Sequence, residues 1–480
     1  LLMEKAFCSA KPILVHKSNT SDASSRIARS HTGSLSTSEE VVNAAFRQCG
    51  ILRVTDMHST IHALKAHSLP PMRGNRLAIV SRSGGHAVVA ADAAANYGFA
   101  LQPFPEEFLR MVAGRLRAGV IRLGNPMDLG DLFDLQFFQT IVNDTLARSD
   151  IDGMLVVYNY NGVFFEEDSR SLVHAIKEAS QRIRKPTALC LVTSDEEYRL
   201  NRRNHPNFPM FTEPEEAVHA LAVSRDFYCR QLANFAEAKG FAVEKKKAME
   251  IVTTARARGD RQLTTPEAFQ VLSHYGIPLA PWTLVTSAEE TSDRAASLGF
   301  PVVMKVIGEE FIHKSDVGGV ILSLNSESEV RQAYHHLVSL IQKTKPGETE
   351  NGVLVQKMVS DGYEVFVGGK QDPTFGPVVV VGLGGVYVEV FQDVAFRVAP
   401  VGEDEAWNML GEIRGARILQ GIRGQPPADQ NALTQIIQRL SQLVCDLGQI
   451  EEVDINPLKV LPQGRGCLGV DCRMVLSAYS

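Results

Sequence analysis

The sequence predicts a two-part protein, with doubly wound parallel α/β sheets in its first half and a largely antiparallel α+β arrangement in its second half. Two patterns carry this prediction. In the first half, short apolar strands alternate with amphipathic helical stretches, as in RLAIVS followed by GGHAVVAADAAANYG. In the second half, strands such as GYEVFVGGKQ and GPVVVVGLGG follow one another across glycine turns. A length of 480 residues leaves room for roughly two to four domains.

The composition is that of a folded globular chain. Hydrophobic residues make up 44% and charged residues 22% of the sequence, and the formal net charge is −6. These values argue against disorder and against nucleic acid as a partner. No apolar run approaches the roughly 20 residues that span a bilayer, and the first residues lack the apolar core of a secretion signal. We therefore expect a cytoplasmic protein with no membrane partner. The seven cysteines are scattered without C-x-x-C pairs, which favours buried thiols over metal or disulfide chemistry.

The first half divides into two predicted α/β regions. Before residue 70, PILVHK and ILRVTD are expected strands, with a helix from about Ser38 to Gln48 between them. Between residues 73 and 225, the segments RLAIVS, DGMLVVYNY and KPTALCLVTS are expected strands of a parallel sheet with helices on both faces. The opening residues have the pattern of a helix already under way, so we expect the sequence to begin inside a domain.

A charged helical stretch, residues 232–262, is the predicted boundary between the halves, with Gly259 and Asp260 as helix breakers. From Thr265 the pattern changes. TTPEAFQVLSHYGIP predicts a capped helix, and FPVVMKVIG, GGVILSLNS and GVLVQKMV then predict strands separated by turns. No repeat of fixed period is present in the sequence.

Two segments of the first half have residues suited to phosphate. In RSHTGSLS, His31 lies among hydroxyl residues and a glycine, and an imidazole can accept a phosphoryl group and return it. The same spacing also suits an ordinary turn. In SRSGG, the loop Ser83-Gly84-Gly85 joins a strand to a helix N-terminus, where backbone N–H groups favour an anion. Any tight strand-to-helix turn needs glycine, however, so this signal alone is weak.

The second half carries a separate set of polar candidates. Lys305 lies on the strand PVVMKVIG, where a lysine that points into a cleft can hold a nucleotide phosphate; a solvated lysine at a strand end is the alternative. His313 precedes the flexible sequence Asp-Val-Gly-Gly. The strands QIEEVDINPLKV and GCLGVDCRMVL carry Asn456 and Asp471, and an amide and a carboxylate oxygen on adjacent strands suit Mg²⁺. Alone, that pair does not decide between metal binding and an ordinary polar contact.

Together, six motifs resemble one family in their order along the chain. SHTGSL, GNRLAIVSRSGG, GNPMDL, HKSDVGGV, DPTFGPVVVVGLGG and VDINPL are similar to the motifs of the NDP-forming acyl-CoA synthetases, which are ADP-forming acetate–CoA ligases related to succinyl-CoA synthetase. The resemblance covers nearly the whole chain. It implies flavodoxin-like, succinyl-CoA synthetase-like domains over residues 1–70 and 71–231, a helical linker over 232–262 and an ATP-grasp domain over 263–480.

The resemblance also implies roles for the two histidines and the glycine loop. His31 matches the histidine that accepts phosphate from an enzyme-bound acyl phosphate, and His313 matches a second histidine that relays phosphate toward the nucleotide. Ser83-Gly84-Gly85 would then cap one of the helices whose N-termini flank the phosphohistidine. The histidine loop would travel between the acyl site and the ATP-grasp cleft.

In the ATP-grasp region, the resemblance implies a nucleotide and metal site. Lys305 would contact phosphate, Gln356 and Glu364 would lie near the nucleotide, and Asn456 with Asp471 would hold Mg²⁺. The expected ligands are ATP or ADP, Mg²⁺, CoA and a small carboxylic acid or its acyl-CoA. The expected reaction interconverts acyl-CoA, ADP and phosphate with the free acid, CoA and ATP. A homodimer or higher oligomer is expected.

The sequence departs from the family pattern at its front. An N-terminal CoA-binding domain is expected in the family and is not part of this sequence, so the chain alone should be incomplete for CoA binding. The same motifs are also compatible with two alternative functions. One is a catalytically silent, ligase-like regulatory module or protein-acyltransferase-associated module. The other is an ATP-grasp ligase that joins a carboxylate to an amine without a phosphohistidine.

Overall fold

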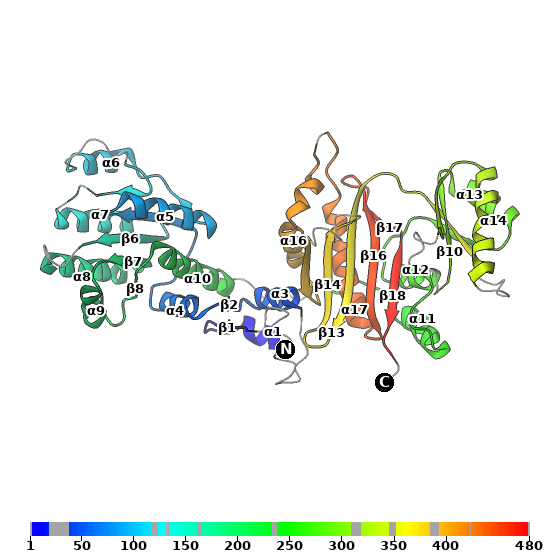
Figure 1. Ribbon diagram of the computed structural model, residues 1–480, viewed down its shortest axis with the longest axis horizontal. Helices are drawn as coiled ribbons and strands as arrows, with labels where there is room; N and C mark the ends of the chain where they lie inside the picture. The colour runs from blue at the N-terminus through cyan, green and yellow to red at the C-terminus, as the bar shows by residue number, and fades with distance from the viewer. Residues whose placement is uncertain are drawn as a thin grey trace. The chain divides into compact units, whose positions relative to one another are not determined.

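Figure 1 shows the computed structural model of the chain. The structure describes residues 2–18, 38–116, 123–130, 132, 134–160, 166–232, 238–308, 318–344, 352–384, 393–422 and 424–478. The chain forms two compact units. The first comprises Leu1–Ser34 and Cys49–Phe235, and the second comprises Leu35–Gln48 and Ala236–Ser480. A short early segment of the chain therefore belongs to the second unit, and the chain then returns to the first.

The first unit contains two parallel sheets. The smaller sheet pairs β1 with β2, and the larger has the strand order β4-β3-β6-β7-β8, with β5 also paired to β3. The strands of the first unit are β1 (Leu14–His16), β2 (Leu52–Val54), β3 (Arg76–Ser81), β4 (Ala100–Leu101), β5 (Met127–Asp128), β6 (Gly153–Asn159), β7 (Thr187–Val192) and β8 (Met210–Phe211). Its helices are α1 (Leu2–Phe7), α4 (Met57–Ala66), α5 (Gly84–Asn96), α6 (Glu106–Ala113), α7 (Leu135–Ala147), α8 (Glu166–Ile183), α9 (Asp195–Asn204) and α10 (Pro214–Leu232).

The central strands of the larger sheet are uninterrupted apolar runs because helices cover both faces. Leu77, Ile79, Leu155 and Val156 are all fully buried, as the inner strands of a parallel sheet require. All of the described ladders in this sheet are parallel. The predicted doubly wound α/β arrangement is therefore confirmed, and the carboxyl ends of β3 and β6 lie at the same edge of the sheet, because parallel strands share their direction.

The second unit contains two antiparallel sheets, which agrees with the sequence prediction. One has the order β11-β10-β12-β9, and the other has the order β15-β14-β13-β16-β17 with β18 paired to β16. The strands are β9 (Trp282–Val285), β10 (Val302–Val306), β11 (Val320–Leu324), β12 (Val353–Lys357), β13 (Tyr363–Asp372), β14 (Gly376–Leu383), β15 (Val394–Val398), β16 (Ile450–Val460), β17 (Cys467–Gly469) and β18 (Cys472–Leu476).

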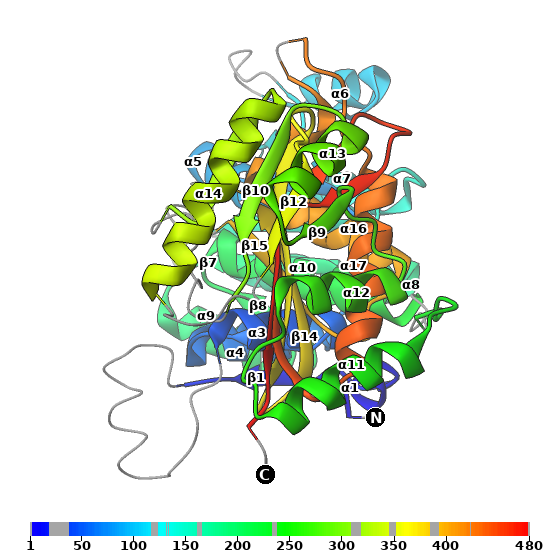
Figure 2. The same cartoon turned by 90° about the vertical axis from the view of Figure 1, so that its right-hand side faces the viewer.

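Helices cover these sheets on the faces where the strands are apolar. α13 and α14 pack on each other and on the smaller sheet, as Figure 2 shows, and α17 packs on the larger one. The helices of the unit are α3 (Glu39–Cys49), whose last residue returns to the first unit, α11 (Lys245–Arg258), α12 (Thr265–His274), α13 (Ala288–Leu298), α14 (Glu327–Thr344), α16 (Glu403–Glu412), a 3₁₀ helix (Arg414–Gln420) and α17 (Gln430–Asp446). Within the described ranges, no helix is both long and apolar enough to cross a membrane.

The stretch expected to be a linker, residues 232–262, contributes to the second core. Ala248, Val252 and Ala255 of α11 are fully buried in the same cluster as α12. Gly259 ends α11 in the left-handed conformation, at φ 85°, as the sequence predicts for a helix breaker. A capping box between Thr264 and Glu267 then begins α12.

Helix α3 is fixed to the outer strand of the larger sheet of the second unit. Gln48 donates from Nε2 to the Val398 carbonyl at 3.0 Å and accepts from the Val398 N–H at 2.8 Å. The side-chain amide thus satisfies both backbone groups of Val398 on β15, which would otherwise face no strand. The sequence predicted this helix, but its contacts with residues some 350 positions later leave no local signal.

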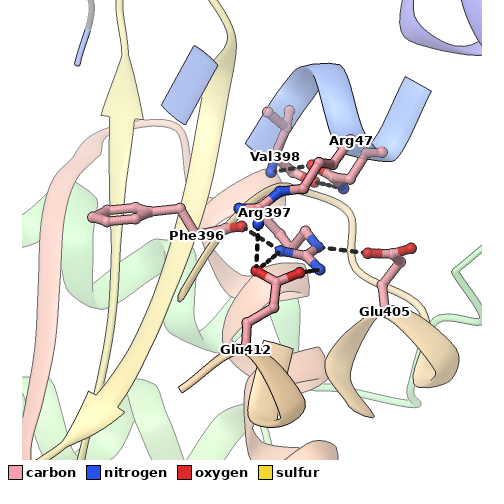
Figure 3. A network of polar contacts seen from close by, with 7 residues as sticks. Arg47, Phe396, Arg397, Val398, Glu405 and Glu412 are labelled. Carbon is pink, nitrogen blue, oxygen red and sulfur yellow. Dashed lines mark hydrogen bonds and ion pairs between the residues drawn. The ribbon is translucent and has the colours of Figure 1, made fainter. Parts of the chain in front are cut away.

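A network of charged side chains lies beside this contact (Figure 3). Arg397 on β15 is 2% exposed, and its guanidinium donates to the carboxylates of Glu405 and Glu412, both from α16. Arg47 of α3 lies 3.2 Å from the same Glu412 carboxylate and is 55% exposed. Two guanidinium groups are thereby matched by two carboxylates, so the buried charge of Arg397 is compensated.

Candidate active site

Lys305 is a buried cation at the junction of two sheets of the second unit. It lies on β10 between β11 and β12, opposite Val320 and Leu354, and its side chain is 5% exposed. Its ammonium donates to the Val470 carbonyl at 2.8 Å and lies 3.7 Å from the Asp471 carboxylate. The structure thus brings the strand lysine to the segment before β18, 165 residues later in the chain.

Asp471 lies on this segment, and Asn456 of β16 lies beside it. The Asn456 backbone N–H donates to the Asp471 carbonyl at 3.2 Å, and the Asp471 side chain accepts from the Cys472 N–H at 2.9 Å. Asn456 is exposed, and the Asp471 side chain is 30% exposed. The Asn456 backbone and Asp471 are thereby brought together, with the Asp471 carboxylate 3.7 Å from the Lys305 ammonium.

Gln356 and Glu364 occupy different environments. Gln356 on β12 is fully buried, donates from Nε2 to the Ala280 carbonyl at 3.4 Å, and has an Oε1 atom with no hydrogen-bond partner among the described residues. Glu364 on β13 lies opposite Lys459 of β16 and pairs with it at 3.0 Å. The Glu364 carboxylate is therefore already partnered by a cation, whereas the Gln356 oxygen is a buried acceptor for which the described residues supply no donor.

The loop Ser83-Gly84-Gly85 lies at the carboxyl end of β3, at the start of α5. The Ser83 hydroxyl caps the helix by accepting from the His86 N–H at 3.5 Å, and it lies 2.8 Å from His86 Nδ1. A Cβ on Gly84 would lie 2.7 Å from an Asp128 carboxylate oxygen, so a larger residue there would require the Asp128 side chain to shift. The predicted strand-loop-helix arrangement is present. A carboxylate at the edge of the loop is a feature that the sequence analysis did not single out.

The two predicted phosphate-carrying histidines, His31 and His313, lie outside the described residues. Their roles therefore remain predictions from sequence.

Comparison with known proteins gives two domain matches. Residues 254–476 match an ATP-grasp domain, and residues 2–67 match a succinyl-CoA ligase-like flavodoxin domain. An ADP-forming acetate–CoA ligase I from Archaeoglobus fulgidus is 35% identical over 478 residues, which cover 98% of this chain and 67% of that protein. The chain belongs to the ADP-forming acetate–CoA ligase family. The expected acyl-CoA synthetase family and its α/β and ATP-grasp folds are confirmed.

Two further members of the family are similar to this chain. An ADP-forming 4-hydroxybutyrate–CoA ligase from Nitrosopumilus maritimus is 34% identical over 97% of this chain and 66% of its own length. The beta subunit of the ADP-forming acetate–CoA ligase I from Pyrococcus furiosus is 40% identical over 48% of this chain and 98% of its own length. The 480-residue chain spans about two thirds of the length of the single-chain relatives from A. fulgidus and N. maritimus.

The residues around Lys305 fit a magnesium–nucleotide complex in their chemistry. A buried ammonium beside a backbone carbonyl and a carboxylate can receive phosphate oxygens, and the unsatisfied Gln356 oxygen can accept from an amino group of a base. The oxygens of Asn456 and Asp471 are hard ligands. Among the described residues no three His, Cys, Asp or Glu side chains could together hold a metal ion. Two protein oxygens supplemented by phosphate oxygens and water are typical of Mg²⁺ sites.

One feature at Lys305 and one at the glycine loop could not be read directly from the sequence. The Val470 carbonyl, which accepts from Lys305, has no side-chain signature. Asp128 lies inside the quoted motif GNPMDL and ends the short strand β5, but the sequence does not show that it lies next to the glycine loop. Both depend on contacts between segments that are distant in the chain.

Proposed function

We propose that the whole protein is an acid–thiol ligase that interconverts acyl-CoA, ADP and phosphate with a carboxylic acid, CoA and ATP. The observation that carries the proposal is the position of Lys305 beside Val470 and Asp471, with Asn456 adjacent, within a unit that matches an ATP-grasp domain. Family membership adds the acid and CoA half of the reaction.

In this proposal, the residues of the second unit bind and orient the nucleotide. Lys305 neutralises phosphate charge, Asn456 and Asp471 hold Mg²⁺, and Gln356 and Glu364 lie near the nucleotide. When bound, the metal ion supplies charge neutralisation at the phosphate oxygens. Because Lys305 is buried, its charge is poorly screened by water and acts strongly on a bound phosphate. Phosphoryl transfer relies mainly on such positioning and electrostatics.

The phosphoryl group would pass through His31 and His313. Phosphate attacks the thioester carbonyl of acyl-CoA and displaces CoA, which gives an acyl phosphate. His31 then accepts the phosphoryl group, which releases the carboxylic acid, and His313 relays the group to ADP. Each carrier has a similar transfer potential, so every step is reversible. The Ser83-Gly84-Gly85 loop would place the N-terminus of α5 at the phosphohistidine, where backbone N–H groups favour the anion.

The two alternative functions are not favoured by the relatives. Those matching almost the whole chain are named as acid–CoA ligases, and none of these names describes a carboxylate–amine ligase or a silent regulator. Acetate and 4-hydroxybutyrate occur in the names of relatives with 35% and 34% identity, so overall similarity does not select the acid. We propose a small carboxylic acid as the substrate class.

We also propose an oligomeric, cytoplasmic enzyme. The ADP-forming acetate–CoA ligase I of P. furiosus is named as separate alpha and beta subunits, and each subunit is similar to part of this chain. By their names, the two corresponding parts assemble as subunits in that relative. The seven cysteines are all free, which suits a reducing compartment. Sedimentation velocity would measure the oligomer, with a dimer or larger species expected.

The test is a pair of partial reactions, measured with the natural protein including any segment that precedes residue 1. With ATP labelled at the γ-phosphate, the protein should acquire label that is acid-labile and base-stable, as a phosphoramidate is. His31→Ala should abolish net acyl-CoA formation. His313→Ala should block labelling of His31 from ATP but permit labelling from acyl phosphate, so the two partial reactions separate the two histidines.

His336→Ala is the matched control, because His336 is an exposed histidine on α14 of the same unit. This variant should retain labelling from both donors. Full ligase activity in His31→Ala would contradict the proposed carrier, and labelling from ATP in His313→Ala would contradict the relay.

A further inference from the structure

A basic pocket lies in the first unit, away from every residue assigned above. Its cavity has a volume of about 440 Å³ and is bordered by α4, the end of α9 and the loop that leads to β8. None of its lining residues is acidic. The basic ones are Lys65, Arg199, Arg202, Arg203 and His205.

The arginines of this pocket have little compensation from the protein. Among the described residues, Arg202 and Arg203 form no ion pair, and Arg199 has only Asp195, at 3.9 Å, whose side chain is 95% exposed. Positions 199 and 203 are four residues apart on one helix face, where like charges repel. The position of Arg202 and Arg203 in the last turn of α9 suits the helix dipole. The helix dipole of α9 does not explain why Lys65 of α4 also lines this cavity.

Lys65 of α4 is held at the cavity by neutral groups. Its ammonium donates to the Met210 carbonyl at 2.8 Å and lies 4.8 Å from the centroid of the Phe211 ring. Burial lowers the pKa of Lys65, Glu216 opposes this effect, and the charge of Arg202 adds to it. The cations of α4 and α9 are therefore close enough to repel one another, and an anion between them would relieve that repulsion.

The rest of the cavity wall is apolar, with one buried polar ring. Phe208 is 5% exposed and Met210 is 1% exposed. His205 is 8% exposed and packs against the His174 ring at 5.7 Å between centroids. In the described part of the chain, the His205 ring has no hydrogen-bond partner. A buried ring that lines a cavity and lacks a partner can donate to or accept from a ligand.

We propose that this pocket binds an organic phosphate, with its phosphoryl oxygens at Lys65, Arg202 and Arg203 and its organic part against Phe208. Guanidinium groups match phosphate geometry with paired donors, and a pocket of this volume is within the range of small-ligand sites. The ligand class is a molecule with a phosphoanhydride, which both a nucleoside diphosphate and CoA contain. The site is separate from the proposed nucleotide site at Lys305.

The experiment follows His205 directly by NMR. The protein is labelled with ¹³C-histidine, the His205 signal is assigned by its loss in His205→Gln, and inorganic pyrophosphate, ADP and CoA are titrated in a Lys305→Ala background. All three should shift the His205 signal. Tighter binding of ADP than of pyrophosphate or CoA identifies a nucleotide, and tighter binding of CoA identifies CoA. Organic phosphates that bind no tighter than pyrophosphate would overturn the organic part of the proposal.

Paired variants test the role of charge. Arg202→Ala with Arg203→Ala should weaken binding by about tenfold or more, and Ser68→Glu, which adds a carboxylate at the cavity, should weaken it similarly. The control is Arg110→Ala with Arg182→Ala, which removes two arginines from the last turns of α6 and α8 and should leave binding unchanged. The proposal would be overturned if the His205 signal did not shift at about 10 mM pyrophosphate, ADP or CoA. It would also be overturned if the Arg202→Ala/Arg203→Ala variant bound these ligands as tightly as the protein with both arginines.

Discussion

Two buried cations of the second unit differ in what surrounds them. Arg397 is 2% exposed and donates to two carboxylates, so its charge is compensated within the fold. Lys305 is 4% exposed and has a backbone carbonyl at 2.8 Å and a carboxylate at 3.7 Å, beside an exposed amide. A charge that is tightly paired stabilises one structure, whereas a charge held near a more exposed carboxylate can also serve a ligand. The contrast predicts stability effects at Arg397 and binding effects at Lys305.

The largest expected effect comes from leaving Arg397 without its carboxylates. Glu405→Gln with Glu412→Gln should destabilise the second unit by about 3–5 kcal/mol, because a buried charge loses its compensation. Both tryptophans, Trp282 and Trp407, belong to this unit, so tryptophan fluorescence during urea unfolding measures it selectively.

Adding Arg397→Met to that double variant should recover much of the lost stability, since the buried charge is then gone. Arg47→Ala is the control, because Arg47 is 55% exposed at the same carboxylate and should cost at most about 1 kcal/mol. A triple variant no more stable than the double variant would show that Arg397 is not the cause.

Lys305→Ala should act in the opposite way. Without ligand, the unfolding midpoint should change much less than in the Glu405→Gln/Glu412→Gln variant. The stabilisation by magnesium–ATP should be lost. A ligand at 100 times its dissociation constant stabilises by about 2.7 kcal/mol, and removal of a phosphate-binding cation should eliminate most of this. The measurement is the tryptophan unfolding curve at increasing magnesium–ATP. An unchanged ligand effect in Lys305→Ala would contradict the nucleotide site.

The first unit offers a buried charge of the opposite sign. Glu197 of α9 is 6% exposed and accepts from Arg170 and from the Tyr160 hydroxyl at 2.9 Å. The hydrogen bond from Arg170 lowers the pKa of Glu197 and outweighs the opposing effect of burial. Because the folded pKa is lowered, its stabilisation is present above the ordinary value near 4.3 and is lost as the pH falls through the folded value.

Glu197→Gln should therefore cost about 1.5–3 kcal/mol at pH 7, the range for hydrogen bonds to charged groups. The difference from the unmodified protein should shrink as the pH is lowered below about 4. Urea unfolding followed by circular dichroism at several pH values measures it. A difference that stays constant between pH 7 and pH 3 would show that the carboxylate charge is not responsible.

Asp471→Asn should have the smallest effect on the fold. The metal-free stability should stay within about 1 kcal/mol, as for other partly exposed side chains. Magnesium should lose much of its effect on nucleotide binding, because a carboxylate ligand has become a neutral amide. Calorimetric titration of ATP with and without magnesium measures the difference. A variant that unfolds without metal would show that Asp471 serves the fold.

Sequence reasoning located many of the elements of both sheets because side-chain periodicity is a local property. The apolar runs RLAIVS and DGMLVVYNY became β3 and β6, and the capped helix expected at Thr265 became α12. The residue types of the candidate site were also visible, since Lys305 and Asn456 lie on strands that the pattern predicts and Asp471 directly precedes one. Their contact was not visible, because nothing local records a side-chain contact between segments 165 residues apart.

What the sequence by itself determined is many of the helices and strands, the change from parallel to antiparallel sheets, and the family. These depend on spacing and on motif order, which are written along the chain. Only the tertiary structure decided that α3 belongs with the second unit, that Lys305 meets Val470, and that Lys65 of α4 joins the arginines of α9. Each of these rests on contacts across long stretches of chain. Burial and charge compensation select such contacts only when the whole core has formed.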